Sequence, residues 1–251
     1  TIKAAEAGKH VLCEKPIALN AREAESLQAV CERTRVKIQE AFMVRTHPQW
    51  LGVRDVIKSG RIGDLRLITG FFSYFNRDPN NVRNKTDMGG GALLDIGCYP
   101  ITMSRFIFDF EPWRVLALIK HDPELGIDRL TSAMLDFKSG QSTFTCGTQL
   151  TPCQSIQMFG TRGRIEVEIP FTPPPTRRAR IFIEDDSNNK GNSIEVLEFP
   201  LCNQYTIQGD CFSQAIREVA EQAIALEDSV KNMAVIDALV RSAHSGQWEI
   251  P

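Results

Sequence analysis

The stretch HVLCEKPIAL, residues 10–19, joins an apolar segment to two opposite charges and a proline. Residues 11–13 have the apolar character of a buried strand. Glu14, Lys15 and Pro16 follow directly, so the strand is predicted to end where charged side chains emerge. In a doubly wound sheet, ligands bind outside the carboxyl ends of the strands, and such charges would lie there.

Helical and strand patterns alternate on both sides of that stretch. Residues 1–8, TIKAAEAG, are typical of the end of a helix that glycine closes. Asn20, with Glu23 three residues later, predicts the start of a second helix, and a short strand is expected at 36–39. This alternation is typical of parallel β-α-β units. Residues 1–45 are therefore interpreted as the C-terminal remnant of a doubly wound Rossmann domain.

A different pattern begins at Leu65, where apolar segments are separated by turn signals. Ile165, Val167 and Ile169 alternate with glutamates, as in a strand that has one buried face. Eight segments are predicted to be strands: LRLITGFFSYF, WRVLALIKHD, LTSAMLDF, STFTCGTQL, SIQMFG, RIEVEI, RIFIED and IEVLEF. They predict a large open, mainly antiparallel sheet.

Two helical patterns close the chain, one over residues 211–223 and one from Asp228 to Gly246. We expect these helices to pack back on the first domain, with helices on one face of the sheet. Residues 46–251 are therefore predicted to form an α+β domain. The predicted fold class is α/β followed by α+β.

Composition excludes several classes of function for this 251-residue chain. The net charge of −2 gives no reason to expect a nucleic-acid partner or an anionic membrane. No apolar run approaches the roughly 20 residues of a membrane span. The seven cysteines are odd in number and none is spaced C-x-x-C, so neither a disulfide framework nor a metal site is expected. Reduced thiols predict a cytoplasmic protein.

The Glu14-Lys15-Pro16 turn has two interpretations. In the functional one, Lys15 is a compact cationic donor that reaches a ligand, and Pro16 stiffens the turn that aims it. In the other, the three residues are an ordinary strand exit with an exposed ion pair. From the tripeptide alone, the ordinary strand exit is the favoured interpretation.

A second candidate site lies in DMGGGALLDIGCYPI, residues 87–101. The three glycines at 89–91 predict a loop, and a helix is expected from Ala92 onward. On that helix Asp95 and Tyr99 are four residues apart and therefore share a face. Gly97, which lies between them, would let a flat ligand approach closely. The alternative is a glycine-rich turn followed by a structural contact between tyrosine and aspartate.

Five motifs in order resemble one family, the Gfo/Idh/MocA oxidoreductases. They are EKP, EAFMVR, GGGALLDIGCY, GTRGRIEV and VIDALVRSAHSGQW, and the resemblance covers essentially all 251 residues. The DIG-x-Y segment is similar to the branch that contains dimeric dihydrodiol dehydrogenase, D-xylose dehydrogenase and glucose–fructose oxidoreductase. The resemblance implies hydride transfer between NAD or NADP and a secondary alcohol of a sugar, polyol or trans-dihydrodiol.

The resemblance also implies roles for individual residues. The implied catalytic residues are Lys15, Tyr99 and Asp95. The implied cofactor contacts are Glu14, Lys15, Pro16 and Arg45. The implied substrate contacts are Arg83, Asp95 and Tyr99, and no metal is implied. His47 is interpreted as structural.

The acid–base chemistry of this residue set is coherent. Oxidation of an alcohol requires a base that accepts the hydroxyl proton while hydride leaves the carbon. The ordinary pKa of tyrosine is about 10, which is high for a base at neutral pH. A lysine cation beside Tyr99 is expected to lower that pKa, so Lys15 and Tyr99 are predicted to act as a pair.

The resemblance leaves a competing hypothesis open. The glycine-rich front of the Rossmann domain is expected to precede residue 1, so we expect residues 1–251 alone to bind NAD(P) weakly and to be inactive. Residues 46–251 are expected to bind substrate and to form a homodimer through the open sheet face. The alternative is an inactive assembly module that lacks the cofactor half. Retention of Lys15, Asp95 and Tyr99 favours an enzyme.

Overall fold

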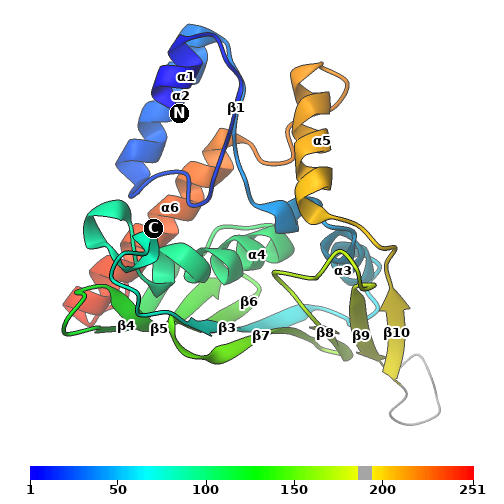
Figure 1. The fold of residues 1–251 in the computed structure, drawn as a ribbon. Helices are drawn as coiled ribbons and strands as arrows, with labels where there is room; N and C mark the ends of the chain where they lie inside the picture. The colour runs from blue at the N-terminus through cyan, green and yellow to red at the C-terminus, as the bar shows by residue number, and fades with distance from the viewer. Residues whose placement is uncertain (186–193) are drawn as a thin grey trace.

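The protein is built in two parts, one small and parallel and one large and mainly antiparallel (Figure 1). The computed structural model describes residues 1–185 and 194–251. The small part begins with α1 (Ile2–Glu6), β1 (Val11–Cys13), α2 (Ala21–Thr34) and β2 (Ile38–Glu40).

The β1 and β2 strands pair in parallel, as the alternating sequence pattern predicts. The amide of Ala41 donates a hydrogen bond to the carbonyl of Cys13 over 2.7 Å, so the pairing extends to the end of β1. Helix α2 begins with the predicted capping box. Asn20 accepts from the amide of Glu23 over 2.9 Å, and Glu23 accepts from the amide of Leu19 over 3.1 Å.

The large part is an eight-stranded sheet in the order β10-β9-β8-β7-β3-β6-β5-β4. All neighbours are antiparallel except β3 and β6, which run parallel. Each of the eight segments predicted as strands is a strand in the structure. Their bounds are β3 (Leu65–Phe75), β4 (Arg114–His121), β5 (Asp128–Phe137), β6 (Gly140–Gly147), β7 (Gln149–Gly160), β8 (Gly163–Val167), β9 (Arg180–Asp185) and β10 (Ile194–Glu198).

Helices cover one face of this sheet, and the other face is open (Figure 1). The helices on this face are α3 (Pro48–Lys58), α4 (Cys98–Phe108) and α6 (Leu226–Ser245), whereas α5 (Gln204–Ile216) extends away from the sheet and packs against residues 43–46. Short 3-10 helices span Met43–Thr46, Val82–Asn84 and Thr86–Met88, and a π-helix spans Leu93–Gly97. Within residues 1–185 and 194–251, every helix is too short or too polar to cross a membrane.

The first of the two terminal helices differs from its predicted extent at both ends. It begins at Gln204 and not at residue 211. Helix α5 ends at Ile216 and does not reach residue 223. Glu218 has a left-handed backbone, with φ of 60°, and this conformation cannot continue a helix. Helix α6 packs on the first part of the chain, where Asp237 accepts a hydrogen bond from the amide of Ala21 over 2.9 Å.

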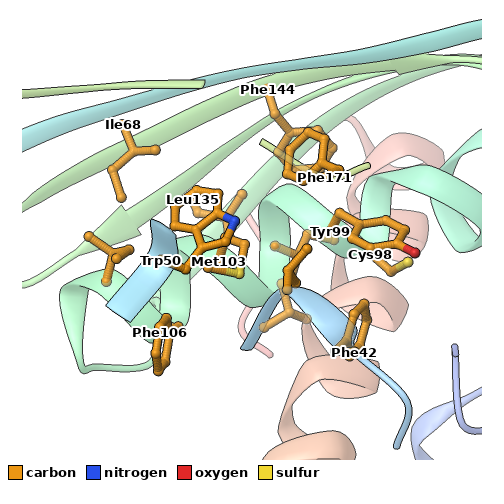
Figure 2. Packing of buried hydrophobic residues seen from close by; sticks show 14 of the residues in the cluster. Phe42, Trp50, Ile68, Cys98, Tyr99, Met103, Phe106, Leu135, Phe144 and Phe171 are labelled. Carbon is orange, nitrogen blue, oxygen red and sulfur yellow. The ribbon is translucent and has the colours of Figure 1, made fainter. Parts of the chain in front are cut away.

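The core lies between the helices and the inner face of the sheet (Figure 2). Trp50 is fully buried and donates its indole N–H to the carbonyl of Pro170 over 2.8 Å. Phe72 and Phe171 stack with ring centroids 4.8 Å apart. Aromatic side chains bury large apolar areas, so this cluster holds the helices on the sheet. It also surrounds Tyr99, the residue implied to be catalytic.

Candidate active site

A groove of about 480 Å³ opens where β1 ends. Its walls come from the turn that follows β1, from the segment of short helices after β3, and from the π-helix. The lining residues used below are Glu14, Lys15, Pro16, Ile17, Arg83 and Asp95. The groove therefore lies at the carboxyl end of the parallel strands, the usual ligand position in a doubly wound sheet.

Lys15 is the central cation of the groove. Its Nζ atom lies 3.2 Å from Oδ1 of Asp95 and also donates to the Asp95 carbonyl. The same Nζ atom lies over the ring of Tyr99, 4.9 Å from the centroid. The peptide bond from Lys15 to Pro16 is cis. The structure thus brings Lys15, Asp95 and Tyr99 together from segments 80 residues apart.

The Asp95 carboxylate is shared by three side chains. Oδ1 accepts from Lys15 and from Nε of Arg83, each over 3.2 Å. Oδ2 accepts from the hydroxyl of Tyr74, on β3, over 2.5 Å. Two cations and one phenol therefore converge on one carboxylate that is mostly buried. Burial and this carboxylate together raise the pKa of Tyr74, which keeps its proton and donates it.

The glycine loop before the π-helix fits closely around Asp128, the first residue of β5. Oδ2 of Asp128 accepts from the amide of Leu93 over 2.7 Å and so caps the helix that carries Asp95. Gly91 has φ of 124°, and a Cβ atom there would overlap the Asp128 carboxylate. Glycine is required at position 91 because other residues rarely adopt this backbone conformation and because a side chain there would overlap Asp128.

The surroundings of Gly97 differ from the prediction. A Cβ atom at Gly97 would lie 2.9 Å from Sγ of Cys146, on β6, so the glycine lets the helix approach the sheet and does not face a flat ligand. The turn of Leu93–Gly97 is a π-helix, which has more residues per turn than an α-helix. Asp95 lies in this turn and Tyr99 lies in the first turn of α4, and both side chains contact Lys15.

Tyr99 is buried, with 5% of its surface exposed. Its ring makes edge contacts with Phe42 and Phe72, and its hydroxyl donates to Sδ of Met43 over 3.6 Å. Burial raises the pKa of Tyr99 well above its ordinary value, and the nearby thiol of Cys98 raises it further. The prediction that Lys15 lowers this pKa is therefore wrong in this structure, because desolvation of the phenolate outweighs a cation over the ring face.

Arg45 has other partners. Its Nη1 atom pairs with Oδ2 of Asp228 over 2.8 Å, and its guanidinium lies 4.3 Å from the centroid of the Phe106 ring. Arg45 is not among the residues that line the groove at Lys15, so the structure does not place it with the other implied cofactor contacts. Glu14, in contrast, is exposed at the groove.

His47 occupies a structural position. Its Nδ1 atom accepts from the amide of Gln49 over 3.1 Å and caps α3, and its Nε2 atom lies 3.4 Å from Sγ of Cys202. Burial lowers the pKa of His47 to about 4, so the ring is neutral at physiological pH.

Sequence reasoning missed three side chains that shape the site: Tyr74, Asp128 and Glu40. Tyr74 lies inside a correctly predicted strand, but period-two alternation does not show which side chain reaches a carboxylate on another element. No pattern in the sequence around Asp128 indicated that its side chain would contribute to the site. Glu40 did carry a signal, because it comes directly after the strand predicted at 36–39, as Glu14 comes directly after the strand at 11–13.

Comparison with known proteins agrees with the fold and the motifs. Residues 50–166 match the GFO/IDH/MocA C-terminal domain, and residues 1–42 match the oxidoreductase family with an NAD-binding Rossmann fold. An oxidoreductase of Rhizobium meliloti is 45% identical over 99% of this chain and 75% of its own length. The NADP-dependent D-xylose 1-dehydrogenase 2 of Haloferax volcanii is 30% identical over 97% of this chain and 73% of its own length.

A solved structure extends the comparison to three dimensions. The 3-ketoreductase of Actinomadura kijaniata, in complex with NADP and TDP-benzene, superimposes with a TM-score of 0.88. It is 29% identical and is matched over 96% of this chain and 73% of its own. The motifs, the two-part fold and these similarities lead to one conclusion: the chain belongs to the Gfo/Idh/MocA oxidoreductase family.

Proposed function

We propose that the complete protein is an NAD(P)-dependent oxidoreductase that transfers hydride between a nicotinamide cofactor and the secondary alcohol or ketone of a sugar, polyol or diol. The single observation that carries this proposal is that Lys15, at the groove after β1, contacts both the Asp95 carboxylate and the ring of the buried Tyr99. Membership of an oxidoreductase family with an NAD-binding fold supports the same reaction class.

The groove has the chemical character that a nicotinamide ring with its carboxamide requires. Ile17, Val82 and Met88 supply apolar surface, and Lys15 and Glu14 supply a donor and an acceptor. When bound, the cofactor supplies or accepts the hydride. Glu14, Lys15 and Pro16 are proposed to hold its nicotinamide end. The position of Arg45 gives no support to a cofactor contact, because Asp228 neutralises its charge.

In the direction of ketone reduction, Tyr99 is proposed to be the proton donor. Its raised pKa means that the hydroxyl carries the proton that this step transfers. The present contact of that hydroxyl with the Met43 sulfur is weak and is readily exchanged for a carbonyl oxygen. As the carbonyl carbon gains hydride, its oxygen gains the Tyr99 proton, and the resulting phenolate lies beside the Lys15 ammonium. The oxidation of an alcohol returns that proton to Tyr99.

Arg83 and Asp95 are proposed to bind the substrate. Together they offer donors and acceptors at one edge of the groove, an arrangement that suits adjacent hydroxyl groups. The relative from Haloferax volcanii is a dehydrogenase of the sugar D-xylose, which supports this substrate class by similarity.

The direct test is an assay of the complete protein with NADPH and with NADH against aldoses, inositols, keto sugars and trans-diols. We expect oxidation or reduction of at least one class with one cofactor preferred, followed by absorbance at 340 nm. Absence of turnover with every substrate, combined with no binding of either cofactor by calorimetry, would favour the assembly module.

The open face of the sheet is proposed to pair with a second copy of the chain. Leu118, on β4, is 61% exposed, and Met134, on β5, lies on the same face. A hollow of about 550 Å³ extends from these side chains to Thr143 and Thr145 on β6. No helix of the described residues covers this face (Figure 1), and an apolar row of this kind is typical of an interface. The seven free thiols support the proposed cytoplasmic location.

A further inference from the structure

Glu40, the last residue of β2, places a buried carboxyl group directly behind the Lys15 turn. The residue is 1% exposed. Its Oε1 atom accepts a hydrogen bond from the backbone amide of Ile17 over 2.9 Å. Within the described part of the chain, its Oε2 atom has no well-aligned hydrogen-bond partner. A buried carboxyl that is only half satisfied is destabilising by itself, so its presence calls for a structural reason.

That reason lies in how Glu40 and its neighbour close the turn. Glu40 pairs with Cys13 in the parallel register, and the amide of Ala41 donates to the Cys13 carbonyl over 2.7 Å. The Glu40 side chain then reaches past the turn to Ile17. The four residues from 14 to 17 are therefore held at one end by strand pairing and at the other end by one carboxyl group. Lys15 lies inside this closed segment.

We infer that Glu40 is a positioning residue, whose carboxyl group holds the turn of residues 14–17 and thereby fixes where the Lys15 ammonium meets Asp95. The importance of Lys15 for turnover rests on the proposed function. The mechanical link between Glu40 and Lys15 does not, because it depends only on the contacts of the turn.

The charge state of Glu40 adds a dependence on pH. Burial raises the pKa of this carboxyl to about 7. The Ser229 hydroxyl and the Ile17 amide lower it, Asp228 on α6 raises it, and Arg105 on α4 lowers it. A carboxylate accepts a hydrogen bond more strongly than a neutral carboxyl does. While Glu40 stays buried, its hydrogen bond to the Ile17 amide should therefore be stronger above pH 7 than below it, even though ionisation of this carboxyl lowers the stability of the fold as a whole.

The inference can be tested without measuring activity, by the accessibility of Lys15 to acetic anhydride. Mass spectrometry of the complete protein gives the acetylation of Lys15 relative to Lys231, whose side chain is 59% exposed. The ratio removes the part of the pH dependence of amine reactivity that the two lysines share. In the wild type, we expect the ratio to fall several-fold from pH 6 to pH 8. In Glu40→Ala, it should be about tenfold higher at pH 8, the effect of losing a charge-assisted hydrogen bond.

Two conservative variants complete the experiment. Glu40→Gln retains an oxygen that can accept from Ile17 but cannot ionise, so its ratio should not change with pH. Asp237→Asn makes the same replacement at another carboxylate bonded to a backbone amide and should behave as the wild type. A wild-type ratio in a folded Glu40→Ala protein overturns the inference. If that variant does not fold, a wild-type pH dependence in Glu40→Gln overturns it equally.

The outcome is separable from that of the proposed function. If Lys15→Ala retains full turnover while Glu40→Gln alters the labelling of Lys15, the proposed catalytic role fails and the positioning role stands. In the reverse result, Lys15→Ala is inactive and the Glu40 variants label Lys15 as the wild type does. That result removes the positioning role of Glu40 and leaves the catalytic role of Lys15 in place.

Discussion

The Nζ atom of Lys15 lies 3.2 Å from Oδ1 of Asp95, although the two residues are 80 positions apart in the chain. One comes from the turn after a parallel strand, and the other comes from a π-helix that packs on the antiparallel sheet. Their contact therefore joins the two parts of the protein at the groove. Any change that moves one part against the other alters the charge environment of the proposed reaction.

Replacement of Lys15 by alanine should impair both turnover and cofactor binding. It removes the cation that compensates Asp95 and contacts the Tyr99 ring. Steady-state kinetics and calorimetric titration with NADP and NAD provide the two measurements. Lys58→Ala, at an exposed position at the end of α3, is the control and should change neither. Normal cofactor affinity in Lys15→Ala would contradict the proposed contact.

Replacement of Tyr99 by phenylalanine should lower turnover by about 100-fold or more, the usual contribution of general acid–base catalysis. The ring and its aromatic contacts remain, so folding and cofactor affinity should barely change. The measurements are kcat and the cofactor Kd, each determined for the variant and for the wild type. Unchanged kcat in Tyr99→Phe would exclude the role proposed for its hydroxyl.

Replacement of Gly91 by alanine should destabilise the protein by about 2 kcal/mol or more, because its backbone is unfavourable for alanine and the new methyl group overlaps Asp128. Urea unfolding measures the loss. Gly209→Ala, inside α5 with nothing near the new methyl group, should instead stabilise by about 0.5 to 1 kcal/mol. Equal effects of the two substitutions would contradict the tight fit at Gly91.

The stability of the protein should depend on the ionisation of Glu40. Its pKa is about 7 in the folded state and near 4.5 in the unfolded state. The folded state therefore binds the proton more tightly, so the Glu40 contribution to stability is present below pH 4.5 and is lost as pH rises through 7. The difference in free energy of unfolding between wild type and Glu40→Gln should change by about 3 kcal/mol between pH 4.5 and 8. Parallel profiles for the two proteins would refute the raised pKa.

The titration of His47 changes the free energy of unfolding in the opposite direction. The prediction for Glu40 therefore compares the wild type with Glu40→Gln and does not use the wild-type profile alone. Its pKa is lowered to about 4, so acidification below its ordinary value of 6.5 favours the unfolded state. Because Glu40→Gln keeps His47, the contribution of the histidine cancels in the comparison of the two profiles.

Replacement of Leu118 by glutamate should dissociate the proposed dimer, because charge repels charge across a two-fold interface and the apolar row is interrupted. Analytical ultracentrifugation of wild type and variant at several concentrations measures the change. Leu51→Glu places the same charge at an exposed leucine of α3, away from the open face, and should leave the oligomeric state unchanged. A monomeric wild type would contradict the proposed interface.

The sequence by itself determined the elements and much of the chemistry. Apolar segments separated by turn signals marked the eight strands of the large sheet, and Ile165, Val167 and Ile169 alternate with glutamates because that strand has one buried face. The capping box at Asn20 and Glu23 marked the start of α2 for an equally local reason. Lys15 at a strand exit was predictable, because the carboxyl ends of parallel strands collect ligand contacts.

Only the tertiary structure decided which side chains meet. Residue spacing does not encode that Tyr74 shares the Asp95 carboxylate, that Asp128 caps the π-helix, or that Arg45 pairs with Asp228. These contacts join elements far apart in the chain, and packing of the helices on the sheet sets their geometry. The same packing buries Tyr99 and raises its pKa, an effect of desolvation that exists only once the core has formed.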